Sequence, residues 1–227
     1  DISYDDEADN SLKGRCYGTT PKEVIDNASV FNHALRWEGV LSCGKHFPGY
    51  ASAACDPHHE LPVIHKTLAE MEATELVPFR ALLDDLDSLM TCHSYFPCWD
   101  ADRPRWPASL SKNVIGQFLR NQLGYEGLVM TDDLDMGAIL NEVSFEEKII
   151  ACIEAGNDLN LLDRKTAQPA TVSHHVYLNA ISDVFVVQHA VIIIAAGDLL
   201  PIHGHNDVAA DRNLIAAIPH GLSRAFD

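Results

Sequence analysis

Three short apolar segments of the sequence each end in side chains that can carry charge or exchange protons. Lys45 and His46 follow the first segment, His93 follows the second, and Asp132 and Asp133 follow the third. Carboxylates can act as nucleophiles, while imidazole and amine groups can transfer protons or hold hydroxyl groups. One such residue is commonly just a solvated strand end. Three sets after successive segments would instead meet at one place if the segments were parallel strands.

A long loop adds a possible acid and base. It runs from Pro48 to Pro62 and contains Asp56, His58 and His59. Loops of this length often carry function. Asp56 and His58 are two residues apart, so in an extended loop their side chains point the same way. A carboxylate beside an imidazole fixes its tautomer and raises its pKa, as a general acid near neutral pH requires. On spacing alone, a surface histidine with an incidental acidic neighbour is the favoured interpretation of this pair.

The apolar segments alternate with helical stretches. We expect strands at residues 39–43, 88–91, 127–131 and 158–162, with a further candidate at residues 1–5. Thr20, Thr67 and Ser144 each precede a glutamate by three residues, the spacing of a capping box, and Ser111 can cap another helix. Acidic residues of the 67–85 stretch, Glu75 among them, are expected on the wet face of an outer helix.

Strands that alternate with helices predict βαβ units and a parallel sheet covered by helices. A doubly wound sheet and a (β/α)8 barrel both satisfy this pattern. No GxGxxG follows the first strands, which disfavours the dinucleotide-binding sheet. We therefore predict an α/β fold of the (β/α)8 TIM-barrel type, whose active site lies at the carboxyl ends of the strands.

The charge balance excludes two classes of partner. The 227 residues include 16 Lys and Arg against 33 Asp and Glu, a formal net charge of −17. Such a chain does not suit nucleic acid or an anionic membrane surface. No apolar run reaches the roughly 18 residues of a membrane span, and no signal peptide is visible. Six cysteines without a CxxC pair indicate a reducing compartment, which we take to be the cytoplasm.

Two long motifs resemble glycoside hydrolase family 3, in its β-N-acetylglucosaminidase branch. The first is the signature loop, formed by Lys45-His46-Phe47-Pro48-Gly49, Asp56-Pro57-His58 and Leu61-Pro62. The second is the nucleophile motif, which ends Gly127-Leu128-Val129-Met130-Thr131-Asp132-Asp133. Residues 14–18 and 89–93 also match, so the similarity runs from about residue 10 to residue 162.

The resemblance implies a retaining glycosidase that acts on a terminal β-linked sugar, N-acetylglucosamine in this branch, without metal or cofactor. Asp132 matches the nucleophile, His58 the general acid/base, and Asp56 the residue that orients His58. A second carboxyl group is the usual partner of the nucleophile, and the His–Asp pair is a departure typical of this branch. Substrate-binding roles fall on Arg15, Lys45, His46 and His93.

The resemblance also implies a partial barrel. It begins near the fourth strand, and a complete barrel typically takes about 250 residues. We expect residues 1–163 to supply the later βα units, and residues 164–227 have no assignment. Open sheet edges would then favour self-association. The sequence also departs from the family at residues 50–52, beside the expected acid/base.

Two other functions remain open. His203 and His205 have the alternating spacing of a metal-binding strand, and with His46, His93 and Asp132 they would suggest a metal-dependent barrel hydrolase. A polar turn explains the 203–207 stretch more simply. The other alternative is a catalytically silent, sugar-binding fragment.

Overall fold

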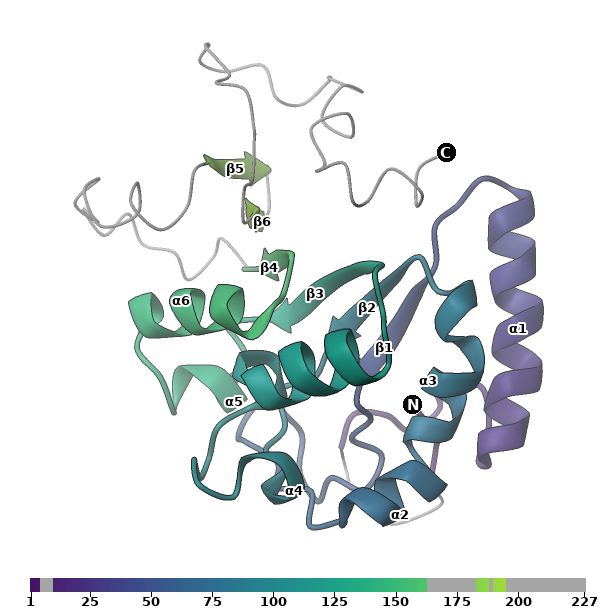
Figure 1. Ribbon diagram of the computed structural model, residues 1–227, viewed down its shortest axis with the longest axis horizontal. Helices are drawn as coiled ribbons and strands as arrows, with labels where there is room; N and C mark the ends of the chain where they lie inside the picture. The colour runs from purple at the N-terminus through teal and green to yellow at the C-terminus, as the bar shows by residue number, and fades with distance from the viewer. Residues whose placement is uncertain (5–9, 163–182, 188–189, 195–227) are drawn as a thin grey trace.

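The computed structural model describes residues 1–4, 10–162, 183–187 and 190–194. Its centre is a sheet whose strands lie in the order β1-β2-β3-β4-β6-β5 (Figure 1). The first four pair in parallel, as expected: β1 (Cys43–Phe47), β2 (Ser88–Thr91), β3 (Leu128–Asp133) and β4 (Leu159–Leu161). Two strands from the segment without a sequence assignment, β5 (Asp183–Val187) and β6 (Ala190–Ile194), extend the sheet in antiparallel fashion.

The predicted strand at residues 39–43 is wrong in position. β1 begins where that prediction ends, because Cys43 pairs with Ser88 and Phe47 pairs with Thr91. Val40 and Leu41 are exposed instead of buried. β2 has the predicted bounds, and β3 runs two residues further than expected. Residues 1–4 form no strand. The candidate residues Lys45, His46 and Asp132 thus lie inside β1 and β3.

Helices connect the strands in the predicted alternation (Figure 1). All four predicted caps form, because the side-chain oxygens of Thr20, Thr67, Ser111 and Ser144 each accept a backbone N–H three residues later. The α-helices are α1 (Pro21–Trp37), α2 (Leu68–Ala73), α3 (Leu76–Leu82), α4 (Pro97–Asp100), α5 (Gly137–Leu140) and α6 (Phe145–Ala155). The described residues also form two short 3-10 turns, η1 (Leu83–Asp85) and η2 (Ala108–Leu110), and a π-helix, η3 (Lys112–Gln122).

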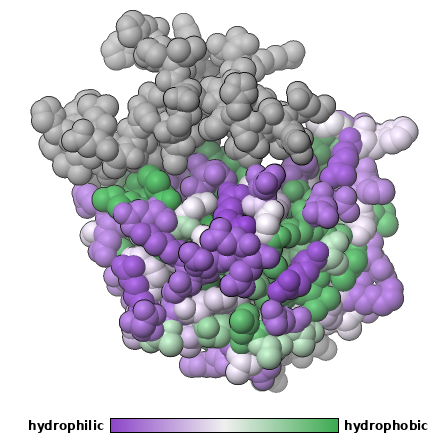
Figure 2. All heavy atoms as spheres, viewed as in Figure 1, coloured by the Kyte–Doolittle hydropathy of each residue, from purple (hydrophilic) through white to green (hydrophobic). Residues whose placement is uncertain are grey.

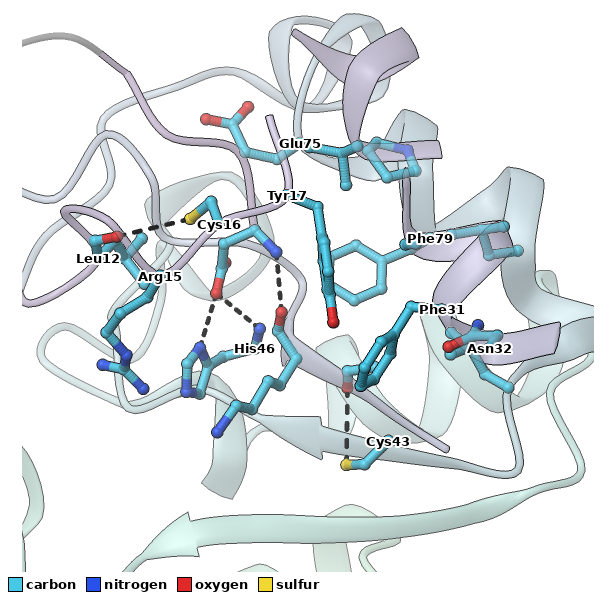
Figure 3. A pocket seen from close by; sticks show the side chains of 18 of the residues that line it. Leu12, Arg15, Cys16, Tyr17, Phe31, Asn32, Cys43, His46, Glu75 and Phe79 are labelled. Carbon is cyan, nitrogen blue, oxygen red and sulfur yellow. Dashed lines mark hydrogen bonds and ion pairs between the residues drawn. The ribbon is translucent and has the colours of Figure 1, made fainter. Parts of the chain in front are cut away.

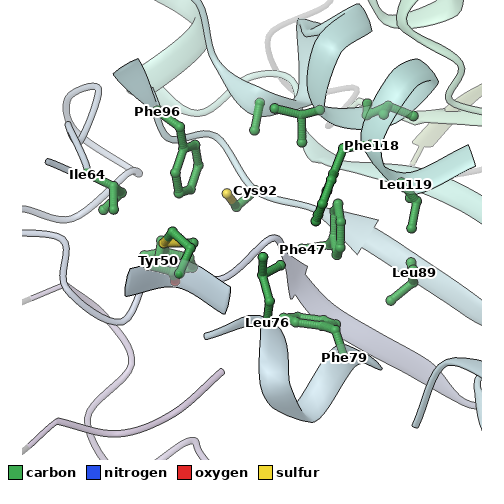
Figure 4. Packing of buried hydrophobic residues seen from close by; sticks show 14 of the residues in the cluster. Phe47, Tyr50, Ile64, Leu76, Phe79, Leu89, Cys92, Phe96, Phe118 and Leu119 are labelled. Atoms are coloured by element: carbon green, nitrogen blue, oxygen red, sulfur yellow. The ribbon is translucent and has the colours of Figure 1, made fainter. Parts of the chain in front are cut away.

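Aromatic residues pack the sheet against its helices. Phe47 of β1 meets Phe79 of α3 edge-on at a centroid distance of 5.3 Å and stacks on Phe118 of η3 at 6.3 Å (Figure 4). Phe47 is completely buried, and burying a phenylalanine side chain stabilises a fold by about 1.5–3 kcal/mol. This packing anchors the end of β1, where Lys45 and His46 lie.

The expectation for Glu75 is wrong, because this residue is buried and not on a wet helix face. Lys66 Nζ lies 2.6 Å from Glu75 Oε1, and the hydroxyl of Tyr4 donates to the same oxygen at 3.1 Å. Gly49 makes room for it, since a Cβ there would come within 2.8 Å of the Glu75 side chain. A buried carboxylate requires such partners, and these tie the N-terminal segment to α3.

Helix α1 leaves much apolar surface uncovered. Val24 and Asn32 are its buried residues, whereas Val30 and Trp37 are 72% and 89% exposed. β1 pairs only with β2 within the described residues, so it forms one edge of the sheet. Figure 2 shows apolar residues among polar ones on the side that carries α1 and α3. No helix in the described part of the chain is long and apolar enough to cross a membrane.

Candidate active site

The carboxyl ends of β1 and β3 bring His46 and Asp132 together. His46 Nε2 lies 3.7 Å from Asp132 Oδ2. The pairing of β1 with β2 is irregular between Lys45 and Phe47, and irregularities of this kind re-aim side chains at sheet rims. The predicted convergence of these two strand ends is therefore present in the fold.

His46 is a buried imidazole held by a carboxylate on its other side. Its Nδ1 atom and its backbone N lie 2.6 Å and 2.8 Å from Asp1 Oδ2. Burial lowers the pKa of His46 to about 3, although the negative charge of Asp132 acts in the opposite direction. Sequence reasoning did not single out Asp1, because nothing in its spacing links it to a residue 45 positions later.

Asp132 is partly accessible, with 24% of its side chain exposed. The backbone N–H of Asp133 donates to its Oδ1 at 2.8 Å, and the Asp135 N–H donates to Asp133 Oδ1 at 3.0 Å. These bonds shape the turn between β3 and α5. The fully buried Lys148 of α6 supports that turn by donating a hydrogen bond to the Leu134 carbonyl at 2.7 Å.

His93 follows β2 but is buried and is not among the residues that line the cavity containing His46. Its Nε2–H donates to the Asp133 carbonyl at 3.0 Å while Nδ1 accepts from the Ser109 hydroxyl at 2.8 Å. Burial lowers the pKa of His93, so the neutral ring is favoured. Both ring nitrogens of His93 therefore make hydrogen bonds within the protein, and Nε2 holds the backbone that follows Asp132.

The acid/base loop carries the predicted pair in contact. His58 Nδ1 and its backbone N lie 2.6 Å and 2.9 Å from Asp56 Oδ1, and 54% of the His58 side chain is exposed. Burial raises the pKa of Asp56, but the hydrogen bonds and charge of His58 outweigh it, so that the pKa is lowered overall. His59 is also exposed, and its carbonyl accepts from Asn141 Nδ2 at 3.2 Å.

This loop is fastened to the helix that follows Asp132. The backbone N–H groups of Gly137 and Ala138 donate to the carbonyls of His58 and Pro57 at 3.0 Å and 3.1 Å. Glycine is needed at 137, since a Cβ there would collide with the His59 carbonyl. The acid/base candidate and the nucleophile candidate therefore sit on segments that support each other.

Arg15 and Lys45 line one cavity together with His46. The cavity measures about 310 Å³, and its remaining walls are largely apolar, with Phe31, Phe79 and Tyr17 around it (Figure 3). Arg15 and Lys45 are exposed, and the Arg15 guanidinium donates to the Ser11 carbonyl at 2.9 Å. Three of the four predicted substrate-binding residues thus share one cavity.

The described residues contain no group of three or more His, Cys, Asp or Glu side chains that could hold a metal ion. His203 and His205 lie outside the described residues.

Comparison with known proteins identifies the family. Residues 1–191 match the glycosyl hydrolase family 3 N terminal domain. A beta-hexosaminidase of Alkalilimnicola ehrlichii is 36% identical over 176 residues, which cover 77% of this chain and 49% of that protein. One of Idiomarina loihiensis is 31% identical over 157 residues, which cover 69% and 46%. The chain spans about half the length of these relatives.

Solved structures that resemble this chain include glycoside hydrolase family 3 enzymes. A glycoside hydrolase family 3 beta-N-acetylglucosaminidase from Paenibacillus superimposes with a TM-score of 0.63 at 36% identity, covering 66% of this chain and 28% of that one. NagZ from Neisseria gonorrhoeae, in complex with N-trifluoroacetyl-D-glucosamine, gives 0.63 at 30% identity, covering 73% and 46%. A beta-glucoside phosphorylase, BglX, gives 0.62 at 28% identity, covering 64% and 28%.

The family's N-terminal domain is a TIM-barrel type, so the parallel strands and their helices are part of such a barrel, as predicted. With its signature loop and its β3 carboxylate in the positions described above, the chain belongs to glycosyl hydrolase family 3.

Proposed function

We propose that this chain hydrolyses terminal β-linked N-acetylglucosamine with retention of configuration, through a glycosyl-enzyme intermediate on Asp132. The observation that carries the proposal is the docking of the His58 loop on α5, the helix that follows Asp132. This contact joins the proton donor to the nucleophile's own turn. The sugar assignment rests on the relatives, which are named beta-hexosaminidase and beta-N-acetylglucosaminidase.

In the first step Asp132 attacks the anomeric carbon while His58 donates a proton to the leaving oxygen. One oxygen of Asp132 is held by the Asp133 N–H, and Oδ2, the oxygen near His46, is the one we assign to the attack. In the second step His58 takes a proton from water, which attacks the anomeric carbon, breaks its ester bond to Asp132 and releases the sugar and the free carboxylate. Asp56 accepts from His58 Nδ1, which leaves Nε2 as the nitrogen that exchanges the proton.

Arg15 and Lys45 are proposed to hold sugar hydroxyls or the acetamido group, since both are exposed cations on the wall of the cavity that contains His46. We propose His93 as an indirect contributor through the Asp133 carbonyl. Of the predicted substrate-binding residues, Arg15, Lys45 and His46 therefore line the cavity. His93 instead supports the turn that follows Asp132.

The test is release of 4-nitrophenol from 4-nitrophenyl N-acetyl-β-D-glucosaminide by the purified chain, with the anomeric product followed by proton NMR. Asp132→Asn should abolish turnover, while the surface control Asp26→Asn should not. Parallel reactions with inorganic phosphate separate hydrolysis from phosphorolysis, because one structural neighbour is a phosphorylase. Sugar binding without turnover in the folded wild-type chain would overturn the proposed activity and favour a silent sugar-binding fragment.

We propose further that residues 1–163 are the later βα units of the barrel and that the chain self-associates. The exposed apolar residues of α1 and the edge of β1, which is unpaired within the described part of the chain, support association. A reducing, cytoplasmic location is proposed because all six cysteines are free.

A further inference from the structure

We propose that Asp1 is a positioning residue, an inference that rests on the proposed function: its buried carboxylate holds His46 as the Nδ1–H tautomer, so that Nε2 presents a lone pair beside Asp132. This role is distinct from that of Asp56, which pairs with the histidine of the acid/base loop. Asp1 would act on the reaction only through the His46 ring.

The geometry around Asp1 leaves His46 little freedom. One carboxylate oxygen of Asp1, Oδ2, accepts hydrogen bonds from both the ring Nδ1 and the backbone N–H of His46. The other oxygen, Oδ1, accepts a hydrogen bond from the Tyr50 N–H at 3.3 Å. The Asp1 side chain is 3% exposed and that of His46 is 5% exposed. The Tyr50 ring meets the imidazole edge-on at 5.2 Å. Hydrogen bonds and packing therefore both fix the orientation of the ring.

The direction of the hydrogen bond fixes the tautomer. A carboxylate can only accept, so Nδ1 must carry the proton that reaches Asp1. A neutral ring then has no proton on Nε2. The opposite tautomer would direct an N–H at Asp132 Oδ2, 3.7 Å away. A hydrogen bond from that N–H would stabilise the ionised carboxylate and lower its reactivity as a nucleophile.

The tautomer also decides what His46 offers to a sugar. With a lone pair on Nε2, the ring accepts a hydrogen bond from a hydroxyl placed between it and Asp132. Such a hydroxyl occupies Nε2 without donating to the nucleophile. Orientation of a histidine by a buried aspartate is an established device of catalytic sites, and here the oriented ring would bind substrate and not transfer protons.

Long-range ¹H–¹⁵N NMR of the full chain tests the proposal directly, because the two ring nitrogens of a neutral histidine differ strongly in shift when only one is protonated. The His46 signals are assigned among the twelve histidines as those lost in His46→Gln. The wild-type ring should carry its proton on Nδ1 at neutral pH. A proton on Nε2 would overturn the proposal, and this measurement requires no other variant to fold.

Two variants separate orientation from simple support. Asp1→Ala removes the acceptor, so the Nδ1–H signature should be lost and kcat should fall by about 10²-fold, because the ring would no longer hold the substrate in its reactive position. Asp1→Asn can keep an oxygen facing both His46 donors and lose only the longer bond to Tyr50. It should therefore retain the signature and most of kcat. A signature unchanged in Asp1→Ala would overturn the proposal.

Asp56→Ala is the matched control, since it removes the other aspartate that pairs with a histidine. It should change the signals of His58 and leave those of His46 unchanged. The tautomer is measured without substrate, whereas the proposed function is tested by turnover assays of the wild type and Asp132→Asn. A wrong tautomer would therefore leave the proposed function standing, and a lack of turnover would leave the tautomer assignment standing.

Discussion

Replacing Lys148 should reveal how strongly the turn after the nucleophile depends on one buried cation. The Lys148 side chain is completely buried, and its Nζ lies 2.7 Å from the Leu134 carbonyl and 3.2 Å from Asp135 Oδ1. The Phe145 ring lies 5.2 Å from the same ammonium. Lys148→Met keeps most of the length of the side chain but removes the ammonium group that pairs with the Asp135 carboxylate, which is only 8% exposed.

Breaking a buried ion pair by removing one partner costs about 3–5 kcal/mol. We expect the lower end, about 3 kcal/mol, because the carboxylate is not fully buried and the methionine packs where the lysine stem was. In a domain of this size each kcal/mol moves Tm by about 2–4 °C. Lys148→Met should therefore melt about 6–12 °C lower, measured by circular dichroism together with urea unfolding.

The matched control is Lys112→Met. Lys112 Nζ lies 2.9 Å from Glu154 of α6, but the two side chains are 63% and 56% exposed. An exposed pair of this kind contributes up to about 1 kcal/mol. Equal melting shifts for the two variants, or a Lys148→Met protein that melts with the wild type, would show that burial does not set the strength of this pair.

Four further outcomes follow from the site and the surface. Asp132→Ala should abolish turnover of an activated aryl glycoside, and azide should restore some rate with inverted product; normal turnover would remove Asp132 from the nucleophile role. His58→Ala should lose about 10²–10⁴ in rate on substrates with poor leaving groups and far less on good ones, whereas His59→Ala should show little dependence on the leaving group. Trp37→Ser should shift the chain toward monomer in sedimentation velocity, because it removes the most exposed large apolar side chain among the described residues; a wild-type monomer with a sharp two-state melt would contradict self-association. Asp56 has a lowered pKa when folded, so its contribution to stability should be full above the unfolded value of about 3.9 and lost as pH falls through the lowered folded value. In urea titrations at a series of pH values, Asp56→Asn should reduce the loss of stability at acid pH. An unchanged loss would contradict this prediction.

Local patterns predicted much of the fold. The caps at Thr20, Thr67 and Ser144 involve a side chain and a backbone N–H three residues later, so neighbouring residues are enough to specify them. The bounds of β2 and the alternation of strands and helices follow from apolar runs bounded by turns. The contact between Asp56 and His58 is also local, which is why its spacing could indicate it.

Long-range contacts account for what the sequence patterns missed. β1 lies four residues later than its apolar run indicated, because its pairing with β2 determines the register. Glu75 is buried because Lys66 and Tyr4 reach it from other segments. His93 supports the Asp133 backbone across 40 residues, and Asp1 meets His46 across 45. The sequence identifies which groups can do the chemistry. Which of them face the substrate and which hold another residue in place depends on the packing of segments far apart in the chain, since a polar side chain enters the interior only where another segment supplies its hydrogen-bond partner.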